Sequence, residues 1–404
     1  MTVLLDKFSR LGVDNAPGQE SRQTVGSLQL RGERIDGTAV DFSHGDVNAN
    51  AFEPIPGSLE AFVAGVGRGG GQAYTEYRGC GPARADLAQK LAAFTGAPVC
   101  ADTELIITPG TQGALFLAMG ATVARGDKVA IVQPDYFANR KLVEFFDGEV
   151  VPVQLRYLGT TAAAGLDLDQ LEAAFQAGAR LFLFSNPNNP AGIIYSPAEI
   201  SAIAALARTY GATVIVDELY SRLLYDGRTY THLRAIAGTP DNVITIIGPS
   251  KTESLSGYRV GTAFGSARLI DRMEKLQAIV SLRAAGYSQA VLQTWFNEPA
   301  GWMAERIARH QEIRDALLTI LRGVAGLEAR TPEAGSYLFP RLPAMAVPLP
   351  DFIKALRLQA GVTVTPGTEF GPFTDSFRLN FSQNREAAIQ AIERTAILIE
   401  RYRQ

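Results

Sequence analysis

The sequence contains little cysteine or histidine, which restricts the chemistry to be expected of it. It has two cysteines, Cys80 and Cys100, and three histidines among 404 residues. Two cysteines make no disulfide framework, and neither belongs to a thiol motif with a histidine nearby. Without a cluster of cysteines and histidines, a zinc site is not expected.

Long hydrophobic runs and an excess of one charge are also absent. The longest apolar runs, such as residues 243–248, have the length of a strand and are too short to cross a bilayer. The first ten residues lack the apolar core of a secretory signal. The 38 basic and 41 acidic residues give a net charge of −3, so no general affinity for nucleic acid or an anionic membrane is expected. These features predict a cytoplasmic protein.

The sequence does contain a regular alternation of strand and helix patterns. With 47% hydrophobic and 20% charged residues it resembles a globular protein, and its length favours more than one core. Apolar, β-branched runs predict seven strands, at residues 104–108, 128–133, 149–155, 180–185, 213–217, 242–247 and 261–265. Helical patterns lie between several of them, at residues 113–124, 137–146, 168–177 and 197–210. This alternation predicts an α/β fold with a mainly parallel seven-stranded sheet between helices.

The rest of the chain predicts a second, smaller α+β domain. A helical pattern covers residues 266–323, with interruptions near Gly286 and Pro299. Strand patterns follow at residues 337–339, 362–365 and 377–381, before an amphipathic helix at residues 386–402. The first 47 residues precede the sheet pattern, and we expect them to join this domain. The predicted large domain is 48–285, and the predicted small domain comprises 1–47 and 286–404.

A lysine and an arginine follow the strand predicted at residues 242–247. Lys251 stands between Ser250 and Thr252, and Arg259 lies eight positions beyond it. A lysine amine can form a Schiff base with an aldehyde, and the planar fork of an arginine suits a phosphate. Together they suggest pyridoxal 5′-phosphate as cofactor. The alternative is that Lys251 is an ordinary surface lysine after a buried strand.

Two further strands end in polar groups that suit the same cofactor. Asp217 ends one strand, where a carboxylate can keep a pyridine nitrogen protonated, and Tyr220 can reach the ring's phenolic oxygen. Asn189, in the turn at residues 186–192, offers an amide donor to that oxygen. Each has a plainer explanation, because Asp217 can cap a helix and residues 186–192 can form a simple turn.

An anion site is predicted between the strand at residues 104–108 and the helix after it. Gly110, Thr111 and Gln112 lie where backbone N–H groups at a helix N-terminus bind phosphate. The segment lacks the Gly-Lys-Ser/Thr ending of a Walker motif. Tyr136, after the next strand, can stack on a flat ring or be an ordinary core aromatic. Because loops at the carboxyl ends of parallel strands meet, we expect these groups to share one site.

Taken in order, these motifs resemble those of the class I and II aminotransferases, the fold-type-I pyridoxal-phosphate enzymes related to aspartate aminotransferase. NPNNPAG is similar to the family's N-P-x-N-P-T-G, and DELY to its D-E-x-Y. SKTESLSGYRVG is similar to S-K-x-x-x-x-x-G-x-R-x-G. The resemblance implies a homodimer with shared active sites that moves an amino group between an L-amino acid and a 2-oxo acid.

The resemblance also implies a role for each site residue. Lys251 would carry the cofactor and then shuttle the substrate proton, and Asp217 would pair with the ring nitrogen. Asn189 and Tyr220 would hold the phenolic oxygen, and Tyr136 would stack on the ring. The phosphate site would comprise Gly110, Thr111, Gln112, Ser250 and Arg259, with Tyr74 reaching over from a second subunit. The substrate site would comprise His44, Gly45, Asn189 and Arg378, with the Arg378 fork clamping the α-carboxylate.

Several positions depart from the family pattern or fit it loosely. Gly248 stands where a serine is usual, so one phosphate contact is expected to be lost or replaced. His44 stands where many relatives carry an apolar or small residue, and it is either structural or a substrate contact. Arg283 lies about one residue from the place where some members carry an arginine for a second substrate carboxylate. It could serve a dicarboxylic substrate or lie in a dimer interface.

Two other classes of function share these features. PLP-dependent β/γ-lyases, cyclising synthases and O2-using oxidases of arginine-like amino acids resemble the family in every cofactor motif, so fold and cofactor do not settle the reaction. Transcriptional regulators with this fold carry a DNA-binding domain, which is not expected in a chain with little sequence before the sheet pattern and no excess of basic residues. Aminotransfer is the leading hypothesis.

Overall fold

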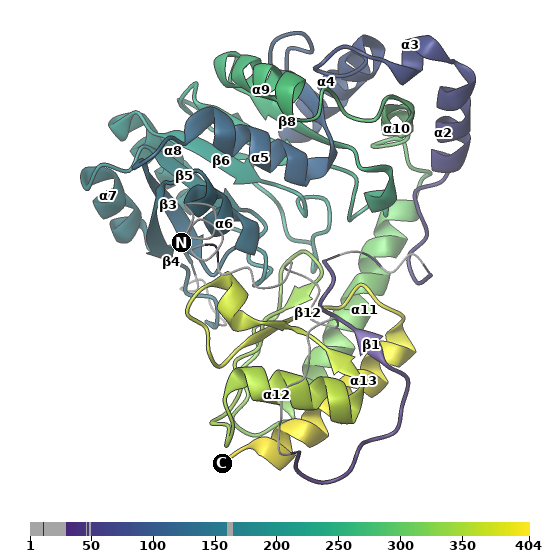
Figure 1. Cartoon of the computed structure of the whole chain (residues 1–404), viewed down its shortest axis with the longest axis vertical. Coiled ribbons are helices and arrows are strands. Elements are labelled where there is room, and N and C mark those ends of the chain that lie inside the picture. Colours follow the sequence, from purple (N-terminus) through teal and green to yellow (C-terminus); the bar gives the residue numbers. More distant parts are fainter. Residues whose placement is uncertain (1–10, 12–29, 46, 48–49, 160–164) are drawn as a thin grey trace, which may run out of the picture.

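The computed structural model describes residue 11 and residues 30–45, 47, 50–159 and 165–404. Figure 1 shows two parts, a sheet with its helices in the upper half and a smaller group of strands and helices below. The first ten residues, where no secretory signal was predicted, lie outside the described residues. Within the described ranges, no helix is both long enough and apolar enough to cross a membrane.

The upper part is built on a seven-stranded sheet, as predicted. Its strands are β2 (Leu105–Thr108), β3 (Lys128–Gln133), β4 (Glu149–Gln154), β5 (Leu181–Ser185), β6 (Thr213–Asp217), β7 (Val243–Ile247) and β8 (Gly261–Gly265). Their order across the sheet is β2-β8-β7-β6-β5-β3-β4. The strand β8 is antiparallel to both its neighbours, and the other pairs are parallel. The mainly parallel α/β architecture is therefore confirmed.

Helices cover both faces of this sheet. One apolar cluster includes side chains of α5 (Gly110–Thr122), α6 (Phe137–Phe145) and α9 (Ala267–Val280), and another includes those of α7 (Leu168–Gln176) and α8 (Pro197–Tyr210). Successive residues of β6 alternate between the clusters, with Val214 in one and Ile215 in the other. At the start of α8, Ser196 and Glu199 form the reciprocal cap that their spacing predicts.

The helical pattern predicted over residues 266–323 is divided into several elements. The helix α9 ends at Val280, and α11 (Trp302–Arg322) begins after Pro299. Between them lie α10 (Gly286–Gln289) and a 3-10 turn, η4 (Ala290–Gln293). A side chain at Gly286 would overlap the backbone of α3 (Gly70–Ala73), so this glycine permits a close approach. The helices α2 (Ser58–Gly67) and α4 (Gly81–Thr95) complete this end of the upper part.

The lower part contains two small sheets covered by helices. The strands β9 (Tyr337–Leu338), β12 (Phe377–Asn380) and β11 (Thr365–Pro366) form an antiparallel sheet with β12 in its centre, and β1 (Val40–Asp41) pairs in parallel with β10 (Val362–Thr363). The predicted strand at residues 362–365 is thus two short strands, because each half pairs with a different partner. The helices here are α11, α12 (Leu349–Ala355) and α13 (Arg385–Tyr402).

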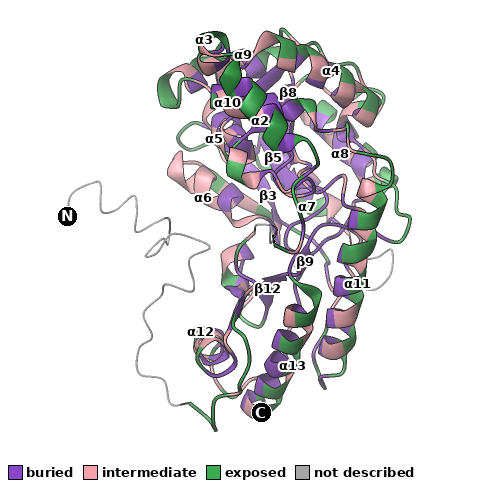
Figure 2. Ribbon diagram, turned by 90° about the vertical axis from the view of Figure 1, so that its right-hand side faces the viewer, coloured by how far each residue is buried: buried purple, intermediate pink, exposed green. Residues whose placement is uncertain are grey.

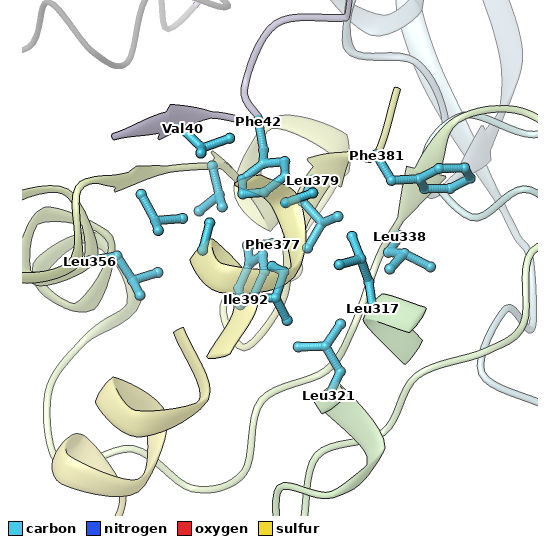
Figure 3. Close-up of a cluster of buried hydrophobic side chains, with 14 of the residues drawn as sticks. Val40, Phe42, Leu317, Leu321, Leu338, Leu356, Phe377, Leu379, Phe381 and Ile392 are labelled. Atoms are coloured by element: carbon cyan, nitrogen blue, oxygen red, sulfur yellow. The ribbon is translucent and has the colours of Figure 1, made fainter. Parts of the chain in front are cut away.

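A single apolar core joins these elements. Figure 3 shows Phe42, Phe377, Leu317 and Ile392 directed toward one another, although they come from distant parts of the sequence. Residues 40–42 therefore pack into the same core as β12, α11 and α13. This packing places the segment that follows, residues 43–45, beside the carboxyl ends of the large sheet's parallel strands.

Candidate active site

A cavity of about 560 Å³ lies between the two parts of the chain. One wall, here called the sheet wall, comes from the carboxyl ends of the large sheet and the first turn of α5, and it includes Thr111, Asp217, Lys251 and Arg259. The other, here called the opposite wall, comes from residues 43–45, Tyr337 and Arg378. The cavity thus lies at the edge of the sheet where the sequence predicts a site.

Most predicted site residues line this cavity. They are His44, Gly45, Thr111, Gln112, Tyr136, Asn189, Asp217, Tyr220, Ser250, Lys251, Arg259 and Arg378. Gly110 lies directly behind them, against the Arg259 guanidinium. Tyr74 and Arg283 are not among the lining residues of this cavity.

Two glycines let Arg259 and the first turn of α5 come together. Gly110 has φ +72°, and a Cβ there would overlap the Arg259 guanidinium. A Cβ on Gly261 would likewise overlap the backbone of Thr111. The cap residue of α5, Pro109, offers no side-chain acceptor to the first backbone N–H groups. An arginine beside an uncapped helix N-terminus is an arrangement that binds a phosphate. The helix begins at Gly110, three residues before the predicted start.

The structure explains why Gly248 departs from the family pattern. A Cβ at this position would lie 2.7 Å from Thr111 Cγ2 and 3.2 Å from Gly261 Cα. Both distances are shorter than ordinary contacts between carbon atoms, so a serine would not fit without movement. The side chain of Thr111 occupies the space that a serine at this position would need.

Asp217 lies at the end of β6 and faces the cavity. The pKa of its carboxyl is raised to about 6, mainly by burial and also by the neighbouring Glu218, while the N–H of Leu219 and the charge of Lys251 oppose the shift. The N–H of Leu219 donates to Asp217 Oδ1 at 3.1 Å. No helix begins here in the described chain, since residues 219–222 form turns, so helix capping does not explain this carboxylate.

Lys251 and Tyr220 lie on the cavity wall near Asp217. Lys251 is half-buried just after β7 and acts electrostatically on Asp217. The Tyr220 side chain is buried, and its hydroxyl lies 2.6 Å from that of Tyr337. The alternative interpretation was that Lys251 is an ordinary surface lysine. Its position on the cavity wall, near a buried carboxylate, does not fit that interpretation.

Arg378 is buried in the opposite wall and lacks a counter-ion. It is 2% exposed, and its guanidinium donates to Asn189 Oδ1 at 3.1 Å and to the carbonyl oxygen of Ser43 at 3.0 Å. Its buried Nε has no hydrogen-bond partner, and no carboxylate of the described residues forms an ion pair with it. Because an unpaired buried charge is costly, this guanidinium suits an anionic ligand that enters the cavity.

A buried carboxylate that the sequence interpretation missed connects several site residues. Asp135 is buried and accepts hydrogen bonds from the N–H of Tyr136, at 2.7 Å, and from both the N–H and the hydroxyl of Ser185. Ser185 Oγ in turn accepts from the N–H of Asn189 at 3.1 Å. Burial raises the pKa of Asp135 to about 7. Asp135 follows a predicted strand just as Asp217 ends one, and this pattern was the available signal.

Tyr337 was also missed as a site residue. Its hydroxyl donates to the carbonyl oxygen of Gly45 at 3.3 Å, and its ring lies against Arg378, with 4.4 Å from Cζ to the ring centroid. The sequence around it indicates only a short strand, and no local motif marks it. On the sheet wall, the hydroxyl of Tyr136 donates to Gln112 Oε1 at 3.0 Å.

Tyr74 and Arg283 lie together on the surface, away from the cavity of this chain. Tyr74 is 68% exposed, and Arg283 Cζ lies 3.4 Å from the centroid of its ring. The guanidinium of Arg283 also donates to the carbonyl oxygen of Thr75. Arg283 therefore does not line the cavity of its own subunit, and both alternatives for it, a substrate contact and a dimer interface, stay predictions.

Comparison with known proteins identifies the family. The model of the aminotransferase class I and II family matches residues 46–394. The crystal structure of an aspartate aminotransferase from Rhodobacter sphaeroides is 64% identical to this chain, with a TM-score of 0.93, and covers 99% of this chain and 100% of its own. The aspartate/prephenate aminotransferase of Thermus thermophilus is 29% identical over 93% of this chain and 94% of its own length. This chain belongs to the class I and II aminotransferases and is itself an aminotransferase of fold type I.

Proposed function

We propose that this aminotransferase uses pyridoxal 5′-phosphate held by the sheet wall and an amino acid held by Arg378 on the opposite wall. The observation that carries this proposal is the buried Arg378, which has an unpaired Nε and no carboxylate partner among the described residues. It lines the same cavity as Lys251. A substrate α-carboxylate would satisfy the guanidinium with two parallel hydrogen bonds.

The residues of the sheet wall fit this cofactor. The first turn of α5 and Arg259 offer an anion site for the phosphate, extended by Ser250. Asp217 offers a carboxylate for the ring nitrogen, and a nearby positive charge would hold it ionised. Asn189 Nδ2 has no partner among the described residues and can donate to the phenolic oxygen together with Tyr220. Tyr136 would cover one face of the ring. When bound, the cofactor supplies an electron sink that makes the substrate Cα–H acidic.

The chain's own residues would then orient the substrate and move its proton. Arg378 fixes the α-carboxylate, which orients Cα toward the sheet wall. The Lys251 amine would anchor the cofactor. Once the substrate amine had taken its place, it would accept the proton from the substrate Cα and, as general acid, deliver it to C4′ of the cofactor. Asp217 stays ionised beside the ring nitrogen throughout. The buried side chains of Tyr220 and Tyr337 limit water on the opposite side.

We infer that the protein works as a homodimer. Several exposed apolar residues belong to α2 or lie near α3 and α10 in the sequence, and these three helices contact one another at one end of the upper part, where Figure 2 shows exposed ribbon. These residues are Leu59, Val63, Val66, Tyr74, Ile279, Val280 and Leu282. Such a patch is typical of an interface, and the resemblance places Tyr74 at the phosphate of a second subunit. Arg283 stacks on Tyr74, so both would enter the partner's cavity.

A dicarboxylic amino acid is the proposed donor. The relative from Rhodobacter sphaeroides is an aspartate aminotransferase, and Arg283 of a second subunit would supply a cation for the side-chain carboxylate. Within one subunit, Arg259, Lys251 and Arg378 already have proposed roles. The cytoplasmic location stays a prediction.

The test is an amino-donor screen read at the cofactor's visible band. We expect L-aspartate or L-glutamate to convert the band without an acceptor, and a 2-oxo acid to restore it. A band that no amino acid converts would contradict aminotransfer. Oxygen consumption or ammonia release without a 2-oxo acid would instead support the lyase or oxidase alternative.

A further inference from the structure

Tyr337 lies where the two walls of the cavity meet. Its hydroxyl oxygen lies 2.6 Å from that of Tyr220 and 3.3 Å from the carbonyl oxygen of Gly45. Its ring packs on Arg378. One buried side chain therefore contacts a residue proposed for the cofactor, the residue proposed for the substrate carboxylate, and the turn beside that carboxylate.

The hydrogen bonds of Tyr337 and Tyr220 cannot all form at once. Each phenol has one proton to donate, whereas the carbonyl oxygen of Gly45 only accepts. If Tyr337 donates to Gly45, the bond between the two phenols must use the Tyr220 proton. Tyr220 then has no proton for the cofactor's phenolic oxygen. If Tyr337 donates to Tyr220 instead, the Tyr220 proton is available to the cofactor.

The contact with Gly45 depends on a segment that Arg378 helps to hold. At 3.3 Å, the hydrogen bond from Tyr337 to Gly45 is longer than a typical O–H···O bond, so a small displacement of this segment breaks it. Arg378 Nη2 donates to the carbonyl oxygen of Ser43 at 3.0 Å. A substrate carboxylate on the Arg378 fork competes for this donor and weakens the attachment of residues 43–45.

We propose that Tyr337 is a positioning residue that directs the Tyr220 proton according to whether a carboxylate occupies Arg378. Without a carboxylate, Tyr337 donates to Gly45 and holds the Tyr220 proton. With a carboxylate bound, Tyr337 donates to Tyr220, which donates to the cofactor's phenolic oxygen. This inference rests on the proposed function, because it requires the cofactor between Lys251 and Tyr220.

The expected consequence is a change in the pH at which the cofactor's visible band titrates. A hydrogen bond to the phenolic oxygen stabilises its negative charge. A proton on the Lys251 nitrogen joined to the cofactor also compensates this charge, so the hydrogen bond stabilises the unprotonated form more than the protonated form. Gaining this bond therefore lowers the titration pH, and losing it raises the titration pH. Burial and the neighbouring Tyr337 raise the pKa of Tyr220 well above its ordinary value, so Tyr220 remains a neutral donor.

The experiment compares band titrations of wild-type holoenzyme and Tyr337→Phe, with and without saturating succinate, a carboxylate that has no amine to react. Without succinate, we expect the Tyr337→Phe band to titrate at a pH lower by about 0.5 to 1 unit, because Tyr337 no longer competes for the Tyr220 proton. With succinate, we expect this difference to disappear. The charged and titratable groups facing the two phenols are the same in both proteins: Arg378, Asp217, Lys251, Arg259, Tyr136 and His44.

Three further variants make the test specific. In a Tyr220→Phe background, Tyr337→Phe should no longer shift the titration, because no Tyr220 proton is left to redirect. Tyr225→Phe removes another buried hydroxyl, which donates to the carbonyl oxygen of Gly335, and should leave the titration unchanged. Gly45→Ala keeps Tyr337 but places a Cβ 3.1 Å from its hydroxyl. It should lower the pH at which the band titrates, as Tyr337→Phe does.

Equal titrations of wild type and Tyr337→Phe would overturn the proposal, as would a shift that persists in the Tyr220→Phe background. A wild-type protein that forms no titrating visible band would overturn the proposed function itself and this inference with it. A normal band with no Tyr337 effect would leave the proposed function intact, so the two failures are distinguishable.

Discussion

The sheet wall and the opposite wall of the cavity are built in different ways. On the sheet wall, Asp217 and Lys251 end or closely follow strands, and the local backbone positions them. On the opposite wall, the hydrogen bond from Arg378 to Ser43 joins residues 335 positions apart in the sequence. The sheet wall is thus set by a rigid sheet, whereas the opposite wall depends on a segment held by a few polar contacts. A wall of the first kind suits a resident cofactor, and one of the second kind suits a substrate that enters and leaves.

The largest effect is expected from Lys251→Ala on the sheet wall. It removes both the anchor and the proposed proton carrier, so we expect kcat to fall by at least about 10⁴-fold. Lys354→Ala is a matched control, because this lysine lies on α12 and pairs with Asp351 at 3.6 Å. Activity of Lys251→Ala within tenfold of wild type would show that another residue moves the proton.

A smaller effect, confined to the substrate, is expected from Arg378→Ala on the opposite wall. Loss of the buried guanidinium should lower kcat/KM for the amino acid by about 10² to 10³-fold. Arg378→Lys should recover part of this loss, since it keeps the charge without the fork. Arg341→Ala, which removes an exposed arginine paired with Glu328, is the control. If steady-state kinetics show an unchanged kcat/KM in Arg378→Ala, then Arg378 does not bind the substrate carboxylate.

The buried carboxyl of Asp135 should make the sheet wall sensitive to pH. Its pKa is raised to about 7 in the folded protein, against about 3.9 in an unfolded chain. The native state therefore binds this proton more tightly, and its contribution to stability is lost as the pH rises through 7. We expect the free energy of unfolding of the apoprotein, measured with denaturant, to fall between pH 4 and pH 7. In Asp135→Asn this fall should be smaller by up to about 4 kcal/mol. An unchanged pH profile would mean that Asp135 is already ionised in the native state.

The smallest effect is expected from His44→Asn. The His44 side chain is 58% exposed, and its Nε2 lies 3.5 Å from Asp41 Oδ2. An exposed pair of this kind contributes little, so we expect KM for the amino donor to change by less than about threefold. A change of tenfold or more in KM would instead make His44 a substrate contact on the opposite wall.

The sequence predicts the sheet wall better than the opposite wall, because local backbone positions the residues of the first and long-range contacts position those of the second. The strands of the large sheet are short apolar runs, and the site residues beside them lie in motifs that can be interpreted locally. Tyr337 stands in a two-residue strand whose pairing with Asn380 depends on long-range packing, so no local pattern indicates that its hydroxyl meets Tyr220. The carboxylate of Asp135 was detectable in principle, but its bonds to Ser185 appear only once β3 and β5 lie side by side.

The most direct test of the division between the walls is the cofactor dissociation constant of Arg259→Ala and Arg378→Ala, titrated with pyridoxal 5′-phosphate by absorbance. Loss of a charge-assisted phosphate contact predicts a rise of about 10 to 100-fold in Arg259→Ala. In Arg378→Ala the constant should stay within about twofold of wild type. Equal weakening in both variants, or weakening only in Arg378→Ala, would contradict the assignment of cofactor and substrate to separate walls.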